Sequence, residues 1–179
     1  MRVIIGHRQD AYVGDEDWDA LLMEHLEVDG RRYVIDRAGA DDVPAIADLL
    51  ADDVLGAARE SDDLAPYEDA FLEIDADPHQ FLAVIRSEGG AIVGTMQLTT
   101  VPGLARGGAK RLLIEGVRLG SSVRGGGLGT TLLEWAHEYG RREGAVLAQL
   151  TSDKSRTDAH RFYERLGYAA THEGFKLTL

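Results

Sequence analysis

The feature that most constrains the fold is a glycine-rich loop between an expected strand and an expected helix, within residues 114–142. Apolar residues alternate through residues 114–119, as in a strand, and recur every three or four positions from Leu128 to Tyr139, as on one helix face. Glycines in the intervening loop let the backbone approach a ligand without Cβ clashes. The start of the helix then offers unpaired N–H groups and a positive dipole end to an anion. This arrangement predicts a site for a phosphate-bearing ligand.

Two common phosphate-binding signatures do not fit the loop. A P-loop requires lysine before Ser or Thr, whereas Gly129 is followed directly by two threonines. The dinucleotide fingerprint requires a third glycine where this chain has Thr130 or Leu132. The pattern that remains is Arg-x-x-Gly-x-Gly, at Arg124, Gly127 and Gly129. Taken alone, it also fits a glycine-rich turn that binds nothing.

This pattern resembles the signature of the GNAT superfamily of acyl-CoA-dependent N-acyltransferases, Gln/Arg-x-x-Gly-x-Gly/Ala between a strand and a helix. Residues 159–168, AHRFYERLGY, are similar to the helix of that family that bears an aromatic-Tyr pair and a Leu-Gly-Phe/Tyr exit. The two segments occur in the family's order and spacing. The resemblance is good over residues 80–179, weaker over residues 31–79, and does not include residues 1–30. We therefore divide the chain into an N-terminal extension, residues 1–30, and a GNAT domain, residues 31–179.

Alternating strand and helix patterns predict an α/β fold with helices on both faces of a mixed sheet. The resemblance implies a mostly antiparallel sheet of six to seven strands, flanked by about four helices and splayed between the fourth and fifth strands. In the extension, residues 15–26 have helical spacing, and three roles stay open: packing on the domain, covering an edge strand or forming a homodimer. The expected strands are residues 33–37, 81–85, 92–99, 111–119, 146–151, 168–172 and 175–179. The other expected helices are one begun by Asp41 or Asp42, a broken helical region over 55–58 and 66–74, the one that opens at Leu128, and residues 158–166.

Composition narrows the function classes. The net charge of −12 argues against binding nucleic acid through its phosphates. No apolar run is long enough for a signal peptide or a membrane span, so we expect a soluble, cytoplasmic protein with no membrane partner. The absence of cysteine excludes disulfides and a thiol nucleophile. Residues 41–77 contain thirteen Asp and Glu but one Arg, which suits either recognition of a cationic amine or a generic soluble surface.

The resemblance implies acetyl-CoA as co-substrate, held largely by backbone groups. Amides of the glycine-rich loop would cradle the pyrophosphate, and the backbone of Val117 and Leu119 would pair with the pantetheine arm as with an extra strand. The Val117 N–H would also bind the thioester carbonyl. Arg156 replaces an Asn that contacts CoA in many members, so it either binds phosphate or only caps the last helix. The expected cofactor-binding residues are Val117, Leu119, Arg124, Gly125, Gly126, Gly127, Leu128, Gly129, Thr130 and Arg156.

Two residues are expected to move protons. In the family the Tyr of the aromatic-Tyr pair points at the CoA sulfur, so Tyr163 is the expected general acid; a core tyrosine is the alternative. Glu115 is the expected general base, directly or through water, or else an anchor for the substrate amine. Strand alternation predicts that its side chain shares a face with Val117 and Leu119. The six histidines lack metal-type spacing, so no metal site is expected.

These expectations combine into an N-acetyltransferase. The resemblance implies transfer of an acetyl group from acetyl-CoA to a primary amine, and the lack of cysteine favours direct transfer in a ternary complex. The acidic segment favours a small cationic acceptor, with a protein lysine or N-terminus as the second choice. The alternative class is a non-catalytic acyl-CoA-binding sensor that signals through the N-terminal extension.

Overall fold

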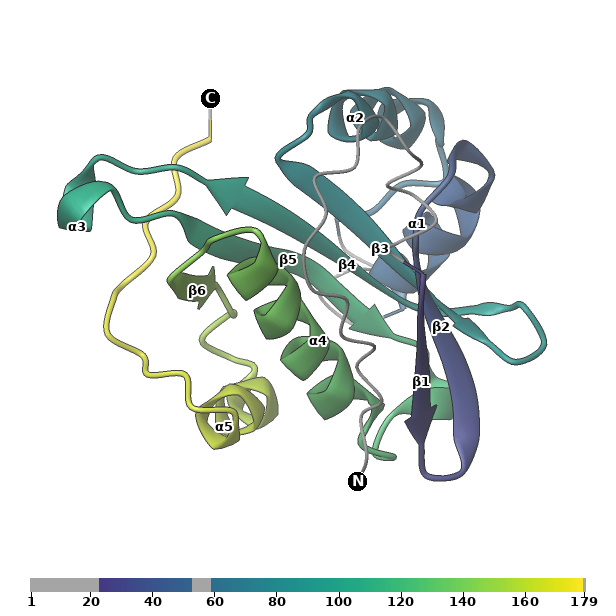
Figure 1. Ribbon diagram of the computed structural model, residues 1–179. Coiled ribbons are helices and arrows are strands. Elements are labelled where there is room, and N and C mark those ends of the chain that lie inside the picture. Colours follow the sequence, from purple (N-terminus) through teal and green to yellow (C-terminus); the bar gives the residue numbers. More distant parts are fainter. Residues whose placement is uncertain (1–22, 53–58, 179) are drawn as a thin grey trace, which may run out of the picture.

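The computed structural model describes residues 23–52 and 59–178, which are built on one six-stranded sheet (Figure 1). The strands lie in chain order, and every neighbouring pair is antiparallel except β5 and β6. β6 pairs only with the first part of β5, up to Ile114, so the two strands separate beyond that point. The expected strands 111–119 and 146–151, fourth and fifth in the predicted order, correspond to β5 and β6, so the splay lies at the expected position. The strands are β1 (Glu24–Val28), β2 (Arg31–Arg37), β3 (Gln80–Ser87), β4 (Ile92–Val101), β5 (Arg111–Leu119) and β6 (Leu147–Leu150).

Helices cover both faces of the sheet, as expected (Figure 1). One face carries α1 (Val43–Ala51) and α2 (Ala65–Ala76), whose apolar residues pack around Val84 of β3. The other face carries α4 (Leu128–Arg142) and α5 (Thr157–Arg165), which pack on a larger core. A short helix, α3 (Ala105–Gly108), lies between β4 and β5, and the 3₁₀ turns η2 (Ala40–Asp42) and η3 (Ser121–Val123) precede α1 and α4.

The helical pattern that begins at Leu128 predicted the buried face of α4. Its five expected core side chains are at most 6% exposed and contact strands β3 to β5 within one cluster: Leu128, Leu132, Trp135, Ala136 and Tyr139. At the start of α1, Asp42 is the N-cap residue, but its carboxylate does not bond to the helix. It accepts instead from the Gly39 amide at 2.9 Å and from the Arg86 guanidinium at 2.7 Å.

Two expectations at the chain ends are wrong. The helix expected over residues 15–26 cannot include its last residues, because Glu24–Val28 form β1 and pair with β2; residues 15–22 lie outside the described residues. The strands expected over residues 168–172 and 175–179 are absent from residues 168–178, the described part. Phe175 and Leu177 alternate as in a strand but are 93% and 85% exposed, because no neighbouring strand pairs with them. Residues 55–58, expected to be helical, also lie outside the described residues.

Gly140 brings α4 into close contact with β5, which generates a stability prediction. A Cβ at Gly140 would lie 2.9 Å from Leu112 Cδ2 and 3.2 Å from Leu112 Cβ. An unobstructed glycine-to-alanine change in a helix stabilises by ~1 kcal/mol, but overpacking a core costs about 1–3 kcal/mol. We expect Gly140→Ala to lower the free energy of unfolding, measured by urea denaturation.

Gly89→Ala is the matched control for this variant. A Cβ at Gly89 would meet nothing within 4 Å, so its free energy of unfolding should change by less than about 0.5 kcal/mol. A Gly140→Ala protein more stable than the parent by ~1 kcal/mol, the unobstructed gain, would contradict the close approach of α4 to β5.

Candidate active site

A β-bulge in β5 shapes the candidate active site. Glu115 pairs with Gln97 of β4 and Arg118 pairs with Thr95, so Gly116 and Val117 stand opposite the single residue between those partners. Gly116 adopts a φ of 59°, a left-handed conformation that glycine reaches without a Cβ penalty. One extra residue in a strand reverses the side-chain alternation beyond it.

The bulge corrects the expectation that Glu115 shares a face with Val117 and Leu119. Before the bulge, Leu112 and Ile114 point toward α4; after it, Val117 and Leu119 pack on that same core. The exposed Glu115 therefore lies on the opposite face, beside Gln97 and on the side of α1 and α2. Strict alternation gave the wrong face because it assumed no extra residue in the strand.

The glycine-rich loop presents a run of free amides. Within the described part of the chain, the N–H groups from Arg124 to Gly129 donate to no acceptor. The Thr130 amide is different, because it donates to the Gly127 carbonyl at 3.0 Å. Gly127 is the N-cap of α4 with a φ of 88°, and no side chain caps the helix start. Successive free amides at a helix N-terminus suit an anion.

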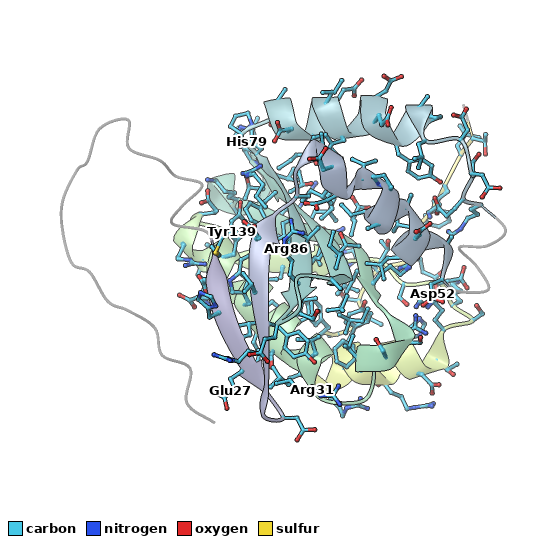
Figure 2. The ribbon with its side chains drawn as sticks, turned by 90° about the vertical axis from the view of Figure 1, so that its right-hand side faces the viewer. Glu27, Arg31, Asp52, His79, Arg86 and Tyr139 are labelled. Carbon is cyan, nitrogen blue, oxygen red and sulfur yellow. The ribbon has the colours of Figure 1, made fainter. Side chains whose placement is uncertain are left out.

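The Arg124 side chain holds the loop rather than facing a ligand. Its Nε donates to the Leu119 carbonyl at 2.7 Å. Its Nη2 pairs with the Asp52 carboxylate at 2.8 Å and donates to the Asp52 carbonyl at 3.2 Å. Asp52 follows α1 and is labelled in Figure 2. The loop is thus tied both to the end of β5 and to the helix on the opposite face of the sheet.

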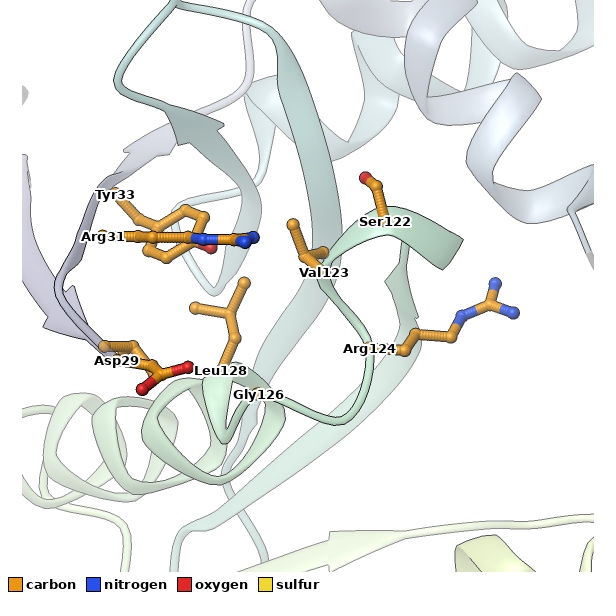
Figure 3. A pocket seen from close by; sticks show the side chains of 9 residues that line it. Asp29, Arg31, Tyr33, Ser122, Val123, Arg124, Gly126 and Leu128 are labelled. Atoms are coloured by element: carbon orange, nitrogen blue, oxygen red, sulfur yellow. The ribbon is translucent and has the colours of Figure 1, made fainter.

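A pocket of about 160 Å³ lies between the β1–β2 turn and this loop (Figure 3). Arg31 extends across it toward Val123, whereas the Arg124 side chain points away. The side chain of Leu128, only 2% exposed, belongs to the core beneath the pocket. The pocket borders the loop on the side of β1 and β2, not on the side of β6.

Tyr163 lies in α5, which packs against β5 and the start of α4. The Phe162 and Tyr163 rings of α5 pack on the same core as Val117 and Leu119, and Phe162 approaches the start of α4 near Gly129. Burial raises the pKa of the Tyr163 hydroxyl, while the nearby Arg156 and Arg118 guanidinium groups act in the opposite direction. The hydroxyl therefore stays protonated up to a higher pH than an ordinary tyrosine does.

Arg156 is the N-cap residue of α5, and no side chain caps that helix. Its carbonyl accepts from the His160 amide at 3.0 Å, so the backbone begins the helix as an N-cap does. Its charge also acts on Tyr163. Arg156 thus lies with Tyr163, on the opposite face of β5 from Glu115.

Sequence reasoning missed two residues that shape this site. Gly116 carried a usable signal, because an isolated glycine within a strand pattern often marks a bulge. Asp52 carried no such signal, since it lies in an acidic run and pairs with Arg124 72 positions away.

Among the residues that the structure describes, no group of three or more His, Asp or Glu lies together where it could hold a metal ion. The described helices include none that is both long and apolar enough to cross a membrane.

Comparison with known proteins identifies relatives of this chain. The chain is 46% identical over 57 residues to an aminoalkylphosphonate N-acetyltransferase of Salmonella typhimurium, and the match covers 32% of this chain and 37% of the relative. A glucosamine 6-phosphate N-acetyltransferase of Trypanosoma brucei brucei is 36% identical over 90 residues, 50% of this chain and 59% of the relative. The chain thus spans less than two thirds of either curated relative.

A solved structure is similar over a longer stretch. The crystal structure of a transcriptional regulator from Bacillus halodurans C-125 is 43% identical, with a TM-score of 0.78, over 82% of this chain and 99% of that one. The profile of the acetyltransferase (GNAT) family matches residues 43–168, which include the loop, Glu115 and Tyr163. This protein belongs to the acetyltransferase (GNAT) family.

Proposed function

We propose that the protein transfers an acetyl group from acetyl-CoA directly to a primary amine of a small molecule. One observation carries the proposal. Where β5 has parted from β6, it has Glu115 on one face and the core that includes Phe162 and Tyr163 on the other. A base on one face and an acid on the other suit direct transfer, because the amine loses a proton while the departing sulfur gains one.

The chain's residues fit acetyl-CoA as the donor, whose thioester supplies the acetyl group when it is bound. The free amides from Arg124 to Gly129 would hold the pyrophosphate at the N-terminus of α4. The part of β5 that has left β6 leaves backbone groups of Val117 and Leu119 for the pantetheine arm. Arg124 keeps the loop in this shape through Leu119 and Asp52.

Each residue then has one role in the transfer. Glu115 takes a proton from the substrate ammonium, directly or through water, which frees the nitrogen lone pair. The Val117 N–H, in the bulge, donates to the carbonyl oxygen and stabilises the charge that develops there. The amine nitrogen then bonds to the acetyl carbon and gives up its second proton to Glu115, which has released the first to solvent. As the carbon–sulfur bond breaks, the Tyr163 hydroxyl gives its proton to the sulfur and regains one from solvent.

The acceptor is a small amine. The two curated relatives are named for an aminoalkylphosphonate and for glucosamine 6-phosphate, and both names describe small amines that also carry phosphorus-containing acid groups. Glu115 lies beside Gln97, whose amide donates to Gln80 Oε1 at 2.6 Å. This neutral, polar surface around one carboxylate suits an amine with further hydrogen-bonding groups. The carboxylate supplies the attraction for the ammonium.

Release of free thiol from acetyl-CoA tests the proposed function. The panel holds aminoalkylphosphonates, amino sugars with and without a 6-phosphate, polyamines, aminoglycosides and basic peptides. Amine-dependent release by the purified full chain supports the proposal, and the best amine identifies the acceptor class. Tight binding of CoA with no release for any amine or peptide would overturn it and favour a sensor.

Tyr163→Phe tests the general acid. Loss of the hydroxyl should lower kcat roughly 10²- to 10⁴-fold, the range for a general acid or base, while the calorimetric Kd for CoA stays unchanged. Tyr139→Phe removes the hydroxyl of a core tyrosine and is the control, with kcat expected near the parent value. Equal kcat in Tyr163→Phe and the parent would assign Tyr163 to packing alone.

Glu115→Gln separates the two roles open to Glu115. If Glu115 is the base, kcat should fall roughly 10²- to 10⁴-fold, and the acidic limb of the kcat/KM profile against pH should disappear. If Glu115 only anchors the ammonium, the KM for the amine should rise while kcat is preserved. A variant with unchanged kcat, KM and pH profile would contradict both roles.

A further inference from the structure

The Tyr163 hydroxyl makes no hydrogen bond to any described residue, so ring packing alone sets its direction. Two aromatic neighbours provide that packing. The centroid of the Phe162 ring lies 5.3 Å from that of the Tyr163 ring, with 58° between the ring planes. The Tyr168 centroid lies 5.8 Å from that of Tyr163, with 69° between the planes, edge to face. Phe162 is the adjacent residue on the helix, whereas Tyr168 approaches from beyond the helix end.

A Schellman motif brings Tyr168 to Tyr163. The Tyr168 amide donates to the Tyr163 carbonyl at 3.1 Å, and the Gly167 amide donates to the Glu164 carbonyl at 3.0 Å. Gly167 has a φ of 89°, as the turn residue of this motif requires. In such motifs the residue after the glycine contacts the one that accepts its amide, and here both are tyrosines.

His137 of α4 holds the far end of Tyr168. Its Nε2 lies 2.7 Å from the Tyr168 hydroxyl, and the two rings are 5.5 Å apart. Burial lowers the pKa of His137, and burial raises that of Tyr168 to about 12, so both groups stay neutral at neutral pH. A neutral pair gives a hydrogen bond without an added charge beside Tyr163. The end of α5 is thereby fixed to α4.

We propose that Tyr168, held by His137, is a positioning residue that fixes the Tyr163 ring so that its hydroxyl faces the reacting sulfur. The contact runs from α4 through two rings to the hydroxyl: His137 orients Tyr168, and the Tyr168 ring edge restricts rotation of Tyr163. This inference rests on the proposed function, because it assumes that the Tyr163 hydroxyl delivers a proton. Neither Tyr168 nor His137 would touch the reacting atoms.

A double-mutant cycle tests the proposal. Tyr168→Phe keeps the ring and removes the bond to His137, and loss of one hydrogen bond should lower kcat about fivefold. Tyr168→Leu also removes the ring contact and should lower kcat more than about tenfold. Both variants should keep the parent's Kd for CoA. In a Tyr163→Phe background neither change should lower kcat further, because the group that they position is gone.

Thr171→Val is the matched control. It also removes a hydroxyl–histidine contact, Thr171 Oγ1 to His172 Nδ1 at 2.7 Å, three residues further along the chain. Its kcat should equal that of the parent. An equal loss of kcat from Tyr168→Phe in the parent and in the Tyr163→Phe background, or no loss at all, overturns the proposal. If Tyr168→Leu fails to fold, Tyr168→Phe still decides.

A second measurement separates this inference from the proposed function. Tyrosine labelled with ¹³C at the Cε positions gives an NMR signal for Tyr163, assigned by its loss in Tyr163→Phe. We expect Tyr168→Phe and His137→Leu to shift this signal and Thr171→Val to leave it in place. An unmoved signal overturns the positioning contact even in an active enzyme. Shifted signals in a protein without turnover would support the contact and reject the proposed function.

Discussion

The candidate site depends on one extra residue in β5, at the bulge of Gly116 and Val117 opposite β4. Without the bulge, strict alternation would put Glu115 on the same face of β5 as Val117 and Leu119. With it, Val117 and Leu119 turn toward α4 and α5, while Glu115 remains on the face of α1 and α2. The same stretch of β5 parts from β6, which pairs no further than Ile114. A backbone irregularity thus places Glu115, the proposed base, and Tyr163, the proposed acid, on opposite faces of β5.

The loop after β5 shows how a flexible sequence is given one shape. Four glycines within residues 120–127 would leave the loop with many conformations. The Arg124 side chain restricts it through hydrogen bonds to Leu119 and Asp52. Such exposed ion pairs contribute only ~0–1 kcal/mol to stability. Here they fix the shape of the loop. Because the Arg124 side chain makes these contacts, the backbone amides from Arg124 to Gly129 remain available.

The sequence predicted what depends on local pattern. The buried face of α4, the central strands and the splayed α/β sheet all follow from spacing or from the family resemblance. The failures depend on pairing with another segment, which the spacing within one segment does not show. Leu26 fits the helical spacing of residues 15–26, yet it alternates with Val28 in β1, because pairing with β2 decides the structure. Phe175 and Leu177 have strand alternation but no adjacent strand, and β pairing is what makes a strand. The bulge could have been predicted only by taking Gly116, an isolated glycine in a strand pattern, as its sign. No sequence pattern near Arg124 or Asp52 predicts that the two residues pair.

The acidic segment illustrates the difference between charge and recognition. Among its described members, most side chains are exposed on α1, on α2 and around them, and Asp42 is the buried one, already paired with Arg86. At physiological salt an exposed charge acts over only about 8 Å. The segment therefore raises the local concentration of cations without choosing among them. In the proposed function, selection of the acceptor would come from direct contacts near the end of β5, where Glu115 lies beside the neutral Gln97. The Gln97 amide has a second N–H beyond the one that it donates to Gln80, and an amine with hydroxyl or acid oxygens can accept from it, whereas a polyamine in its ammonium form offers no acceptor.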